Sequence, residues 1–189
     1  ILGANVYGNQ TTTSRVGIDL RPNNSAARFD LTLNGTVRSS TQGVTDRATV
    51  YTQGHHDFWA RKPITFDGLA FKLSEATIQV SANNTTTGAS TGADGTLFGG
   101  LAENVAVRTA RGKRSQSEAI ARQRVSNRVL PEFNKEVDKK FTTSNKDFEK
   151  RVAAPLKDLG VYPDAYTYRT TDTQMRVSTR LMDEGELGG

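Results

Sequence analysis

Residues 14–38 read SRVGIDLRPNNSAARFDLTLNGTVR, the clearest local pattern in the chain. Apolar residues alternate with polar ones on both sides of a turn: Val16, Ile18 and Leu20 precede it, and Ala27, Phe29, Leu31 and Leu33 follow it. Alternation with a period of two is typical of a half-buried β-strand. Folding the strands about Pro22–Ser25 gathers the apolar side chains on one face and sets Asp19 opposite Arg28 on the other. The stretch therefore predicts an antiparallel hairpin.

The alternation continues to residue 82 and predicts an antiparallel meander over residues 1–82. A third strand is expected near residues 44–62, after a turn at Gln42-Gly43. Asp67-Gly68 is typical of a hairpin turn and separates two further strands. Residues 83–100 are rich in glycine and threonine, and we expect them to form a linker.

The period changes beyond the linker, and residues 101–160 are expected to be helical. The apolar positions recur with a mean spacing of about 3.6 residues, as in an amphipathic helix: Leu130, Phe133, Val137, Phe141, Phe148, Val152, Leu156 and Leu159. Ser144 and Asp147 resemble a capping box, which leaves open whether the helix is broken near 142–145. Pro155 and Gly160 predict its end.

A final β segment is expected over residues 161–189, as a closing strand or a hairpin. Tyr166 and Tyr168 share one phase, whereas Met175, Val177 and Leu181 share the opposite phase, so a turn is expected between them. The sequence predicts a single α+β domain over residues 1–189, with an antiparallel meander packed against a long amphipathic helix.

Composition excludes several classes of function. The 189 residues contain no cysteine and only two histidines, which removes disulfide scaffolds, thiolate metal sites and cysteine nucleophiles. Apolar residues make up 35%, and no run approaches the roughly 20 residues of a transmembrane helix, so no transmembrane segment is expected. The net charge of +5 is concentrated in residues 101–160, where 14 basic and 8 acidic residues give +6.

The basic residues of the expected helix are a candidate polyanion contact. They face one acid within 21 residues: Arg108, Arg111, Lys113, Arg114, Arg122, Arg124 and Arg128. Such a cluster could bind phosphates or anionic lipid head groups. A solvated helix face is the more common role of such residues, and without interleaved aromatic residues nucleic acid is not an expected partner.

The apolar stripe of the helix is a candidate groove for an apolar ligand such as a lipid. Its residues are Phe133, Val137, Phe141, Phe148 and Val152. Packing of the same residues against the sheet is the simpler interpretation, and the one we favour.

His55-His56-Asp57 is the only cluster with ligand chemistry. On a strand His55 and Asp57 point to one side and His56 to the other, so two of them at most could bind one metal ion. Polar strand residues are the favoured interpretation. No nucleophile elbow, HExxH, P-loop or dinucleotide-binding motif occurs, and we expect no enzyme activity, catalytic residue, metal or cofactor.

Three stretches together resemble an uncharacterised family of exported proteins from planctomycete-type bacteria. They are Thr11–Ser14 with Arg21–Asn23 and Leu31–Gly35, then His56–Lys62 with Phe66-Asp67, and Ser115–Ala121. The resemblance covers roughly residues 10–130 and implies export and a long meander followed by a helix. It supplies no activity and no catalytic residue.

The expected protein is therefore a non-enzymatic exported domain of the periplasm or cell envelope. Threonine-rich, lysine-poor strands without cysteine support export. A structural or partner-binding role, with another envelope protein as the partner, is the leading hypothesis. A carrier of an apolar ligand held between sheet and helix is the first alternative, and polyanion binding by residues 108–128 is the second.

Overall fold

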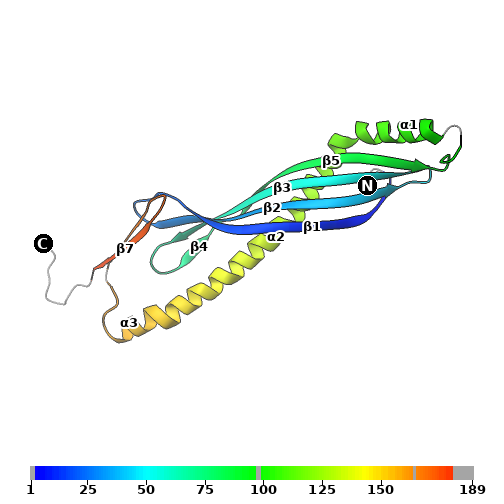
Figure 1. The fold of residues 1–189 in the computed structure, drawn as a ribbon. Helices are drawn as coiled ribbons and strands as arrows, with labels where there is room; N and C mark the ends of the chain where they lie inside the picture. The colour runs from blue at the N-terminus through cyan, green and yellow to red at the C-terminus, as the bar shows by residue number, and fades with distance from the viewer. Residues whose placement is uncertain (1–2, 97–98, 164, 181–189) are drawn as a thin grey trace. The chain divides into compact units, whose positions relative to one another are not determined.

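The computed structural model describes residues 3–96, 99–163 and 165–180, and its fold is α+β. A five-stranded sheet has the order β1-β2-β3-β4, with β5 also paired to β3. Its strands are β1 (Asn5–Leu20), β2 (Ala27–Val44), β3 (Ala48–Phe66), β4 (Phe71–Leu73) and β5 (Thr77–Thr91). Figure 1 places these strands along the chain. The predicted fold class, an antiparallel sheet with a long helix and a C-terminal β hairpin, is confirmed.

The β1–β2 hairpin forms as predicted, but its register is displaced by two residues. The backbone N–H of Arg21 donates to the carbonyl oxygen of Arg28 at 2.9 Å, so Arg21, and not Asp19, lies opposite Arg28. The N–H of Arg28 donates instead to Oγ1 of Thr170, at 3.0 Å. Because Thr170 is far away in the sequence, the hairpin alone could not indicate this register. A shift of two residues keeps every side chain on its expected face.

The next two hairpins form as predicted, but the first of them turns at different residues. The β2–β3 turn lies three residues later than Gln42-Gly43, where Thr45 accepts from and donates to Ala48. The Asp67-Gly68 turn is confirmed: Ile64 pairs with Leu73 across it. Its Gly68 has a φ of 100°, a conformation that favours glycine.

Half of the predicted linker over residues 83–100 is strand. Residues 83–91 continue β5, and a short turn follows in which Asp94 accepts from the N–H and the hydroxyl of Thr91, both at 3.0 Å. The β-branched threonines of this segment fit a strand, although their polarity hides the alternation on which the prediction depended.

The helical region has two bends, neither of them at 142–145. α1 (Gly99–Gly112) is separated from α2 (Arg114–Phe148) by Lys113. α2 runs through residues 142–145 unbroken, because Thr143 and Ser144 bond back to carbonyls four residues earlier instead of capping a new helix. A π-helical turn, η1 (Glu149–Ala153), then leads into α3 (Ala154–Asp158).

The chain, expected to form one domain, divides into two compact units. The first unit comprises Ile1–Arg15, Leu33–Trp59 and Ile78–Val129. The second unit comprises Val16–Thr32, Ala60–Thr77 and Leu130–Gly189.

The second unit has an aromatic core between its strands and the C-terminal part of α2. The ring of Phe141 lies 6.2 Å from that of Phe29 and 5.1 Å from that of Phe71. Phe66 contacts Phe71, Phe148 and Tyr168, with ring centroids 4.6–5.6 Å apart. These large side chains fill the space between helix and sheet, and they give this unit a dry interior.

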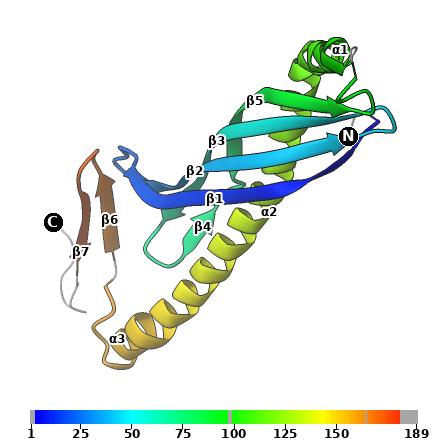
Figure 2. The ribbon, with the colours of Figure 1, turned by 45° about the vertical axis from the view of Figure 1, so that its right-hand side comes forward.

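The predicted C-terminal β segment is a hairpin of β6 (Ala165–Thr170) and β7 (Met175–Arg180). It lies beside the β1–β2 turn (Figure 2), where Asn23 and Thr170 exchange two backbone hydrogen bonds of 2.9 and 2.7 Å. Leu181, which was expected to extend β7, lies outside the described residues.

Candidate functional site

Small and aliphatic side chains line the inner face of α1 and of the start of α2 in the first unit. Positions three and four apart share a helix face. On α1 these positions hold Leu101, Ala102, Val105, Ala106, Thr109 and Ala110, and on α2 they hold Ser117, Ile120, Ala121, Arg124 and Val125.

Mostly small or aliphatic side chains also line the face of the first unit's strands that borders the same space. Alternate positions of β2 and β3 and two positions of β1 point to the same face: Val37, Ser39, Thr41, Gly43, Ala48, Val50, Thr52, Val6 and Gln10. Among the described residues that line this face, the imidazole of His56 is the only aromatic ring. The small side chains therefore leave a space open.

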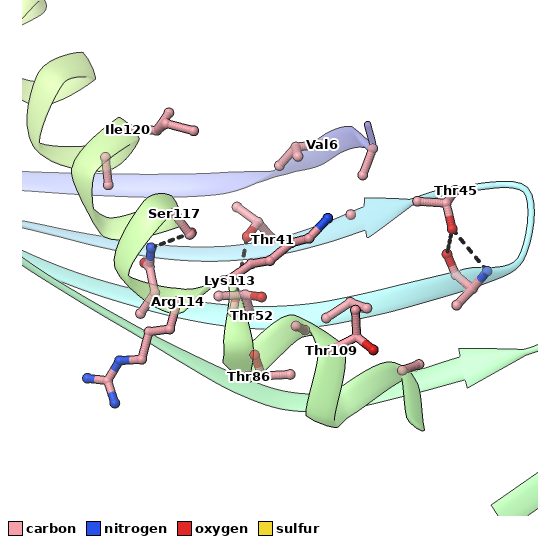
Figure 3. A pocket seen from close by; sticks show the side chains of 18 of the residues that line it. Val6, Thr41, Thr45, Thr52, Thr86, Thr109, Lys113, Arg114, Ser117 and Ile120 are labelled. Atoms are coloured by element: carbon pink, nitrogen blue, oxygen red, sulfur yellow. Dashed lines mark hydrogen bonds between the residues drawn. The ribbon is translucent and has the colours of Figure 1, made fainter. Parts of the chain in front are cut away.

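We call this space the helix–sheet groove. It has a volume of about 990 Å³, and its lining also includes Asn84, Thr86 and Thr91 of β5; all the lining residues belong to the first unit. Figure 3 shows it between the helices and strands β1, β2, β3 and β5. Leu101 and Val105 on its wall are 67% and 65% exposed, so protein atoms leave much of their apolar surface uncovered. The volume is at the upper end of the range of about 300–1,000 Å³ for small-molecule sites.

The charged residues that line the groove are all cations. They are Arg47, Lys113, Arg114 and Arg124, and no carboxylate of the described residues belongs to the lining. Lys113 lies at the junction of the two helices, and its side chain is drawn among those that line the groove (Figure 3). Among the described residues it forms no ion pair. Its ammonium group is therefore available to an anion in the groove.

Arg114 points away from the groove and is held by protein partners (Figure 3). Its Nε donates to Oε1 of Glu118 at 2.7 Å, and a second nitrogen donates to Oδ1 of Asn83 at 3.0 Å. Glu118 also accepts from the backbone N–H of Asn84 at 3.0 Å. The hydrogen bond from Arg114, followed by that from Asn84, holds the pKa of the Glu118 carboxyl below its usual value. These bonds tie the start of α2 to β5.

His56 supplies a buried polar group at the groove. It is 6% exposed, and its Nδ1 has no hydrogen-bond partner in the described part of the chain. Burial, and secondly the neighbouring His55, lower the pKa of the His56 imidazole. His56 is therefore neutral at pH 7.

The seven candidate polyanion residues are distributed over three elements. Arg108 and Arg111 lie on α1, Lys113 lies at the bend, and the other four lie on α2, all of them exposed. Lys113, Arg114 and Arg124 border the helix–sheet groove, and the other four do not. Polyanion binding stays a prediction.

The residues of the candidate apolar stripe lie in the second unit and belong to its core or surface. Phe133 and Val137 are buried, Phe141 and Phe148 make the ring contacts described above, and Val152 is 41% exposed. Packing against the sheet, the interpretation favoured from the sequence, describes the first four. The open groove lies instead along residues 101–125, where the signal was the run of small side chains.

The histidine cluster divides between the two faces of β3. Nε2 of His55 lies 3.5 Å from Oδ2 of Asp57, both exposed, while His56 lies on the groove side. Asp57 also accepts from the Thr36 hydroxyl at 2.7 Å. In the described ranges no three histidine or acidic side chains meet as a metal-binding set. Within the same ranges, none of the helices has both the length and the apolar character needed to cross a membrane.

Comparison of the chain with known protein families, with curated proteins and with solved structures finds no match. The functional proposal therefore rests on the groove and the residues that line it.

Proposed function

We propose that this protein is a non-enzymatic binder or carrier of an amphipathic ligand, an acyl chain with an anionic head group. The ligand would lie in the helix–sheet groove of the first unit. The observation that carries the proposal is the 990 Å³ groove, whose described walls are formed mainly by small and aliphatic side chains.

The chemistry of the lining supports this ligand class. Aliphatic side chains such as Val50 and Ile120 suit a hydrocarbon chain, because burial of apolar surface contributes about 25 cal/mol per Å². Two of the threonine hydroxyls donate to backbone carbonyls, Thr41 to Thr52 at 3.4 Å and Thr109 to Val105 at 2.8 Å. Lys113 supplies a positive charge for the head group, and in the described part of the chain no lining carboxylate opposes it.

The proposal also retains the expected location in the periplasm or cell envelope. A lipid-like ligand is poorly soluble in water, so a carrier with an apolar groove suits a compartment between two membranes. No catalytic group is needed for such a role, which agrees with the absence of a catalytic motif in the sequence.

The test is to fill the groove. Ala106 lies on its α1 wall, and Ala106→Trp would place an indole in the space that the ligand needs. Ala119→Trp is the matched control, because Ala119 is exposed on α2 and does not line the groove. Binding of a fluorescent long-chain fatty acid is expected for the wild type and for Ala119→Trp, and at least a tenfold loss is expected for Ala106→Trp. Equal binding by both variants, or none by the wild type, would contradict the proposal.

A further inference from the structure

Among the described strands, β1 lies at the edge of the five-stranded sheet. In the described part of the chain β1 pairs with β2 alone. It has 16 residues, of which all but Gly17 and Leu20 are exposed. A long open edge presents a row of free N–H and C=O groups that another strand can bind.

The direction of these groups follows from the hairpin register. Arg21 is bonded to β2 through its N–H, and successive residues of a strand direct their backbone groups to alternate sides. The close approach of the Gly17 Cβ position to Oγ1 of Thr32, at 2.9 Å, supports the same register. The even-numbered residues Val16 and Ile18 therefore direct their N–H and C=O groups toward the open edge.

The side chains around Gly17 would complement those of a second, antiparallel copy of the same strand. Val16 and Ile18 share one face and are 59% and 62% exposed. Arg15 and Asp19 share the other face and are also exposed. Among the described residues neither has an ion pair.

The geometry points to a second copy of this chain as the occupant of this edge, paired antiparallel through β1 with a twofold axis at Gly17. In that register Val16 of one copy lies opposite Ile18 of the other, and Arg15 lies opposite Asp19. The Val16–Ile18 pairs would exchange about four backbone hydrogen bonds and join the two exposed apolar patches.

The symmetry is the reason to choose a second copy over another partner. A twofold contact uses the same surface on both subunits, so each residue of the patch must find its complement within that patch. In the segment Arg15–Asp19 each charged residue would face the opposite charge of the other copy, and each aliphatic residue would face an aliphatic one. This inference does not depend on the proposed ligand, because no residue of Arg15–Asp19 lines the helix–sheet groove.

A charge exchange tests the inference. The molecular mass is measured by light scattering after gel filtration over a range of concentrations, with circular dichroism as the check on folding. We expect a dimer for the wild type. Arg15→Asp and Asp19→Arg should each weaken dimerisation by about tenfold or more, because both symmetric pairs become repulsive.

The double variant Arg15→Asp/Asp19→Arg restores opposite charges and should restore the dimer. Ile18→Pro should also prevent dimerisation, because proline lacks the backbone N–H that residue 18 directs toward the open edge. The folded monomer does not use this N–H. A wild type that is monomeric at all concentrations would overturn the inference. So would a dimer that survives Ile18→Pro, or a double variant no more dimeric than the single variants.

Discussion

The ammonium group of Lys62, whose residue is only 1% exposed, lies 3.0 Å from Oδ1 of Asp138 on α2. The same ammonium donates to Oδ1 of Asn134, one helical turn earlier, at 2.5 Å. Asn134 also accepts from the backbone N–H of Ala76 and donates to Glu75. A buried lysine on β3 thus connects the sheet of the second unit to α2, at the point where the aromatic core begins.

Removing the partner of this lysine should cost more than removing the lysine. Asp138→Ala leaves a buried ammonium without its counter-ion, and we expect the free energy of unfolding to fall by about 2 kcal/mol. Lys62→Met removes the charge and keeps most of the buried stem, so a loss below about 1 kcal/mol is expected. Urea unfolding measures both. A larger loss for Lys62→Met would mean that the ion pair contributes net stability.

Phe141 belongs to the aromatic core of the second unit and does not line the helix–sheet groove. Phe141→Ala removes the ring contacts with Phe29 and Phe71 and should lower the free energy of unfolding by about 2–3 kcal/mol. Fatty-acid affinity, measured at a temperature where the variant is folded, should stay within about twofold of the wild type, since the ring does not line the groove. A large loss of affinity in a folded variant would instead assign the ligand to the helical stripe.

The buried His56 predicts a dependence of stability on pH. Its pKa is lowered in the folded state by burial, so the unfolded chain takes up a proton at a higher pH than the folded chain does. The stability gained from the neutral imidazole is present above about pH 6.5, the usual histidine pKa, and is lost as the pH falls below it. Thermal unfolding at pH 7.5 and pH 5.5 should show this loss, and His56→Gln should reduce it. An unchanged difference between the two pH values in the variant would exclude His56 as its source.

Lys113 should distinguish an anionic head group from a neutral one. Lys113→Ala is expected to weaken binding of a long-chain carboxylic acid by about tenfold and to leave binding of the corresponding alcohol nearly unchanged. Arg111→Ala is the control, because Arg111 is an exposed cation near the same bend that does not line the groove. Competition with a fluorescent probe measures both ligands. Equal losses of affinity for the acid and the alcohol would show that Lys113 does not bind the anionic head group.

The sequence predicted the elements that have a regular period. Alternation at Val16, Ile18 and Leu20 was enough for the first hairpin, and the 3.6-residue spacing from Leu130 onward was enough for α2. The register of the hairpin was not accessible, because Thr170 bonds to Asn23 and Arg28 at the hairpin end. β5 was cut short because a threonine-rich strand shows little contrast between its faces.

The location of the groove was not predicted, because small side chains give little signal in a sequence. Large apolar side chains such as Phe141 are the strongest signal in a sequence, and in the folded chain they fill the space they face. A cavity arises where small side chains meet small ones, as Ala106 on α1 and Val50 on β3 do along the groove. Each of these residues is unremarkable alone, so the signal appears only when the helix and strand faces are brought together.

The central claim is that the helix–sheet groove holds an acyl ligand, and native mass spectrometry of protein secreted into a bacterial periplasm tests it most directly. The protein is sprayed under mild conditions, and the released molecule is extracted into organic solvent and identified. The account predicts one extra mass per chain, extracted as a fatty acid or related anionic lipid, present in Ala119→Trp and absent from Ala106→Trp. A bare chain mass for the wild type that persists after incubation with fatty acid would contradict the account.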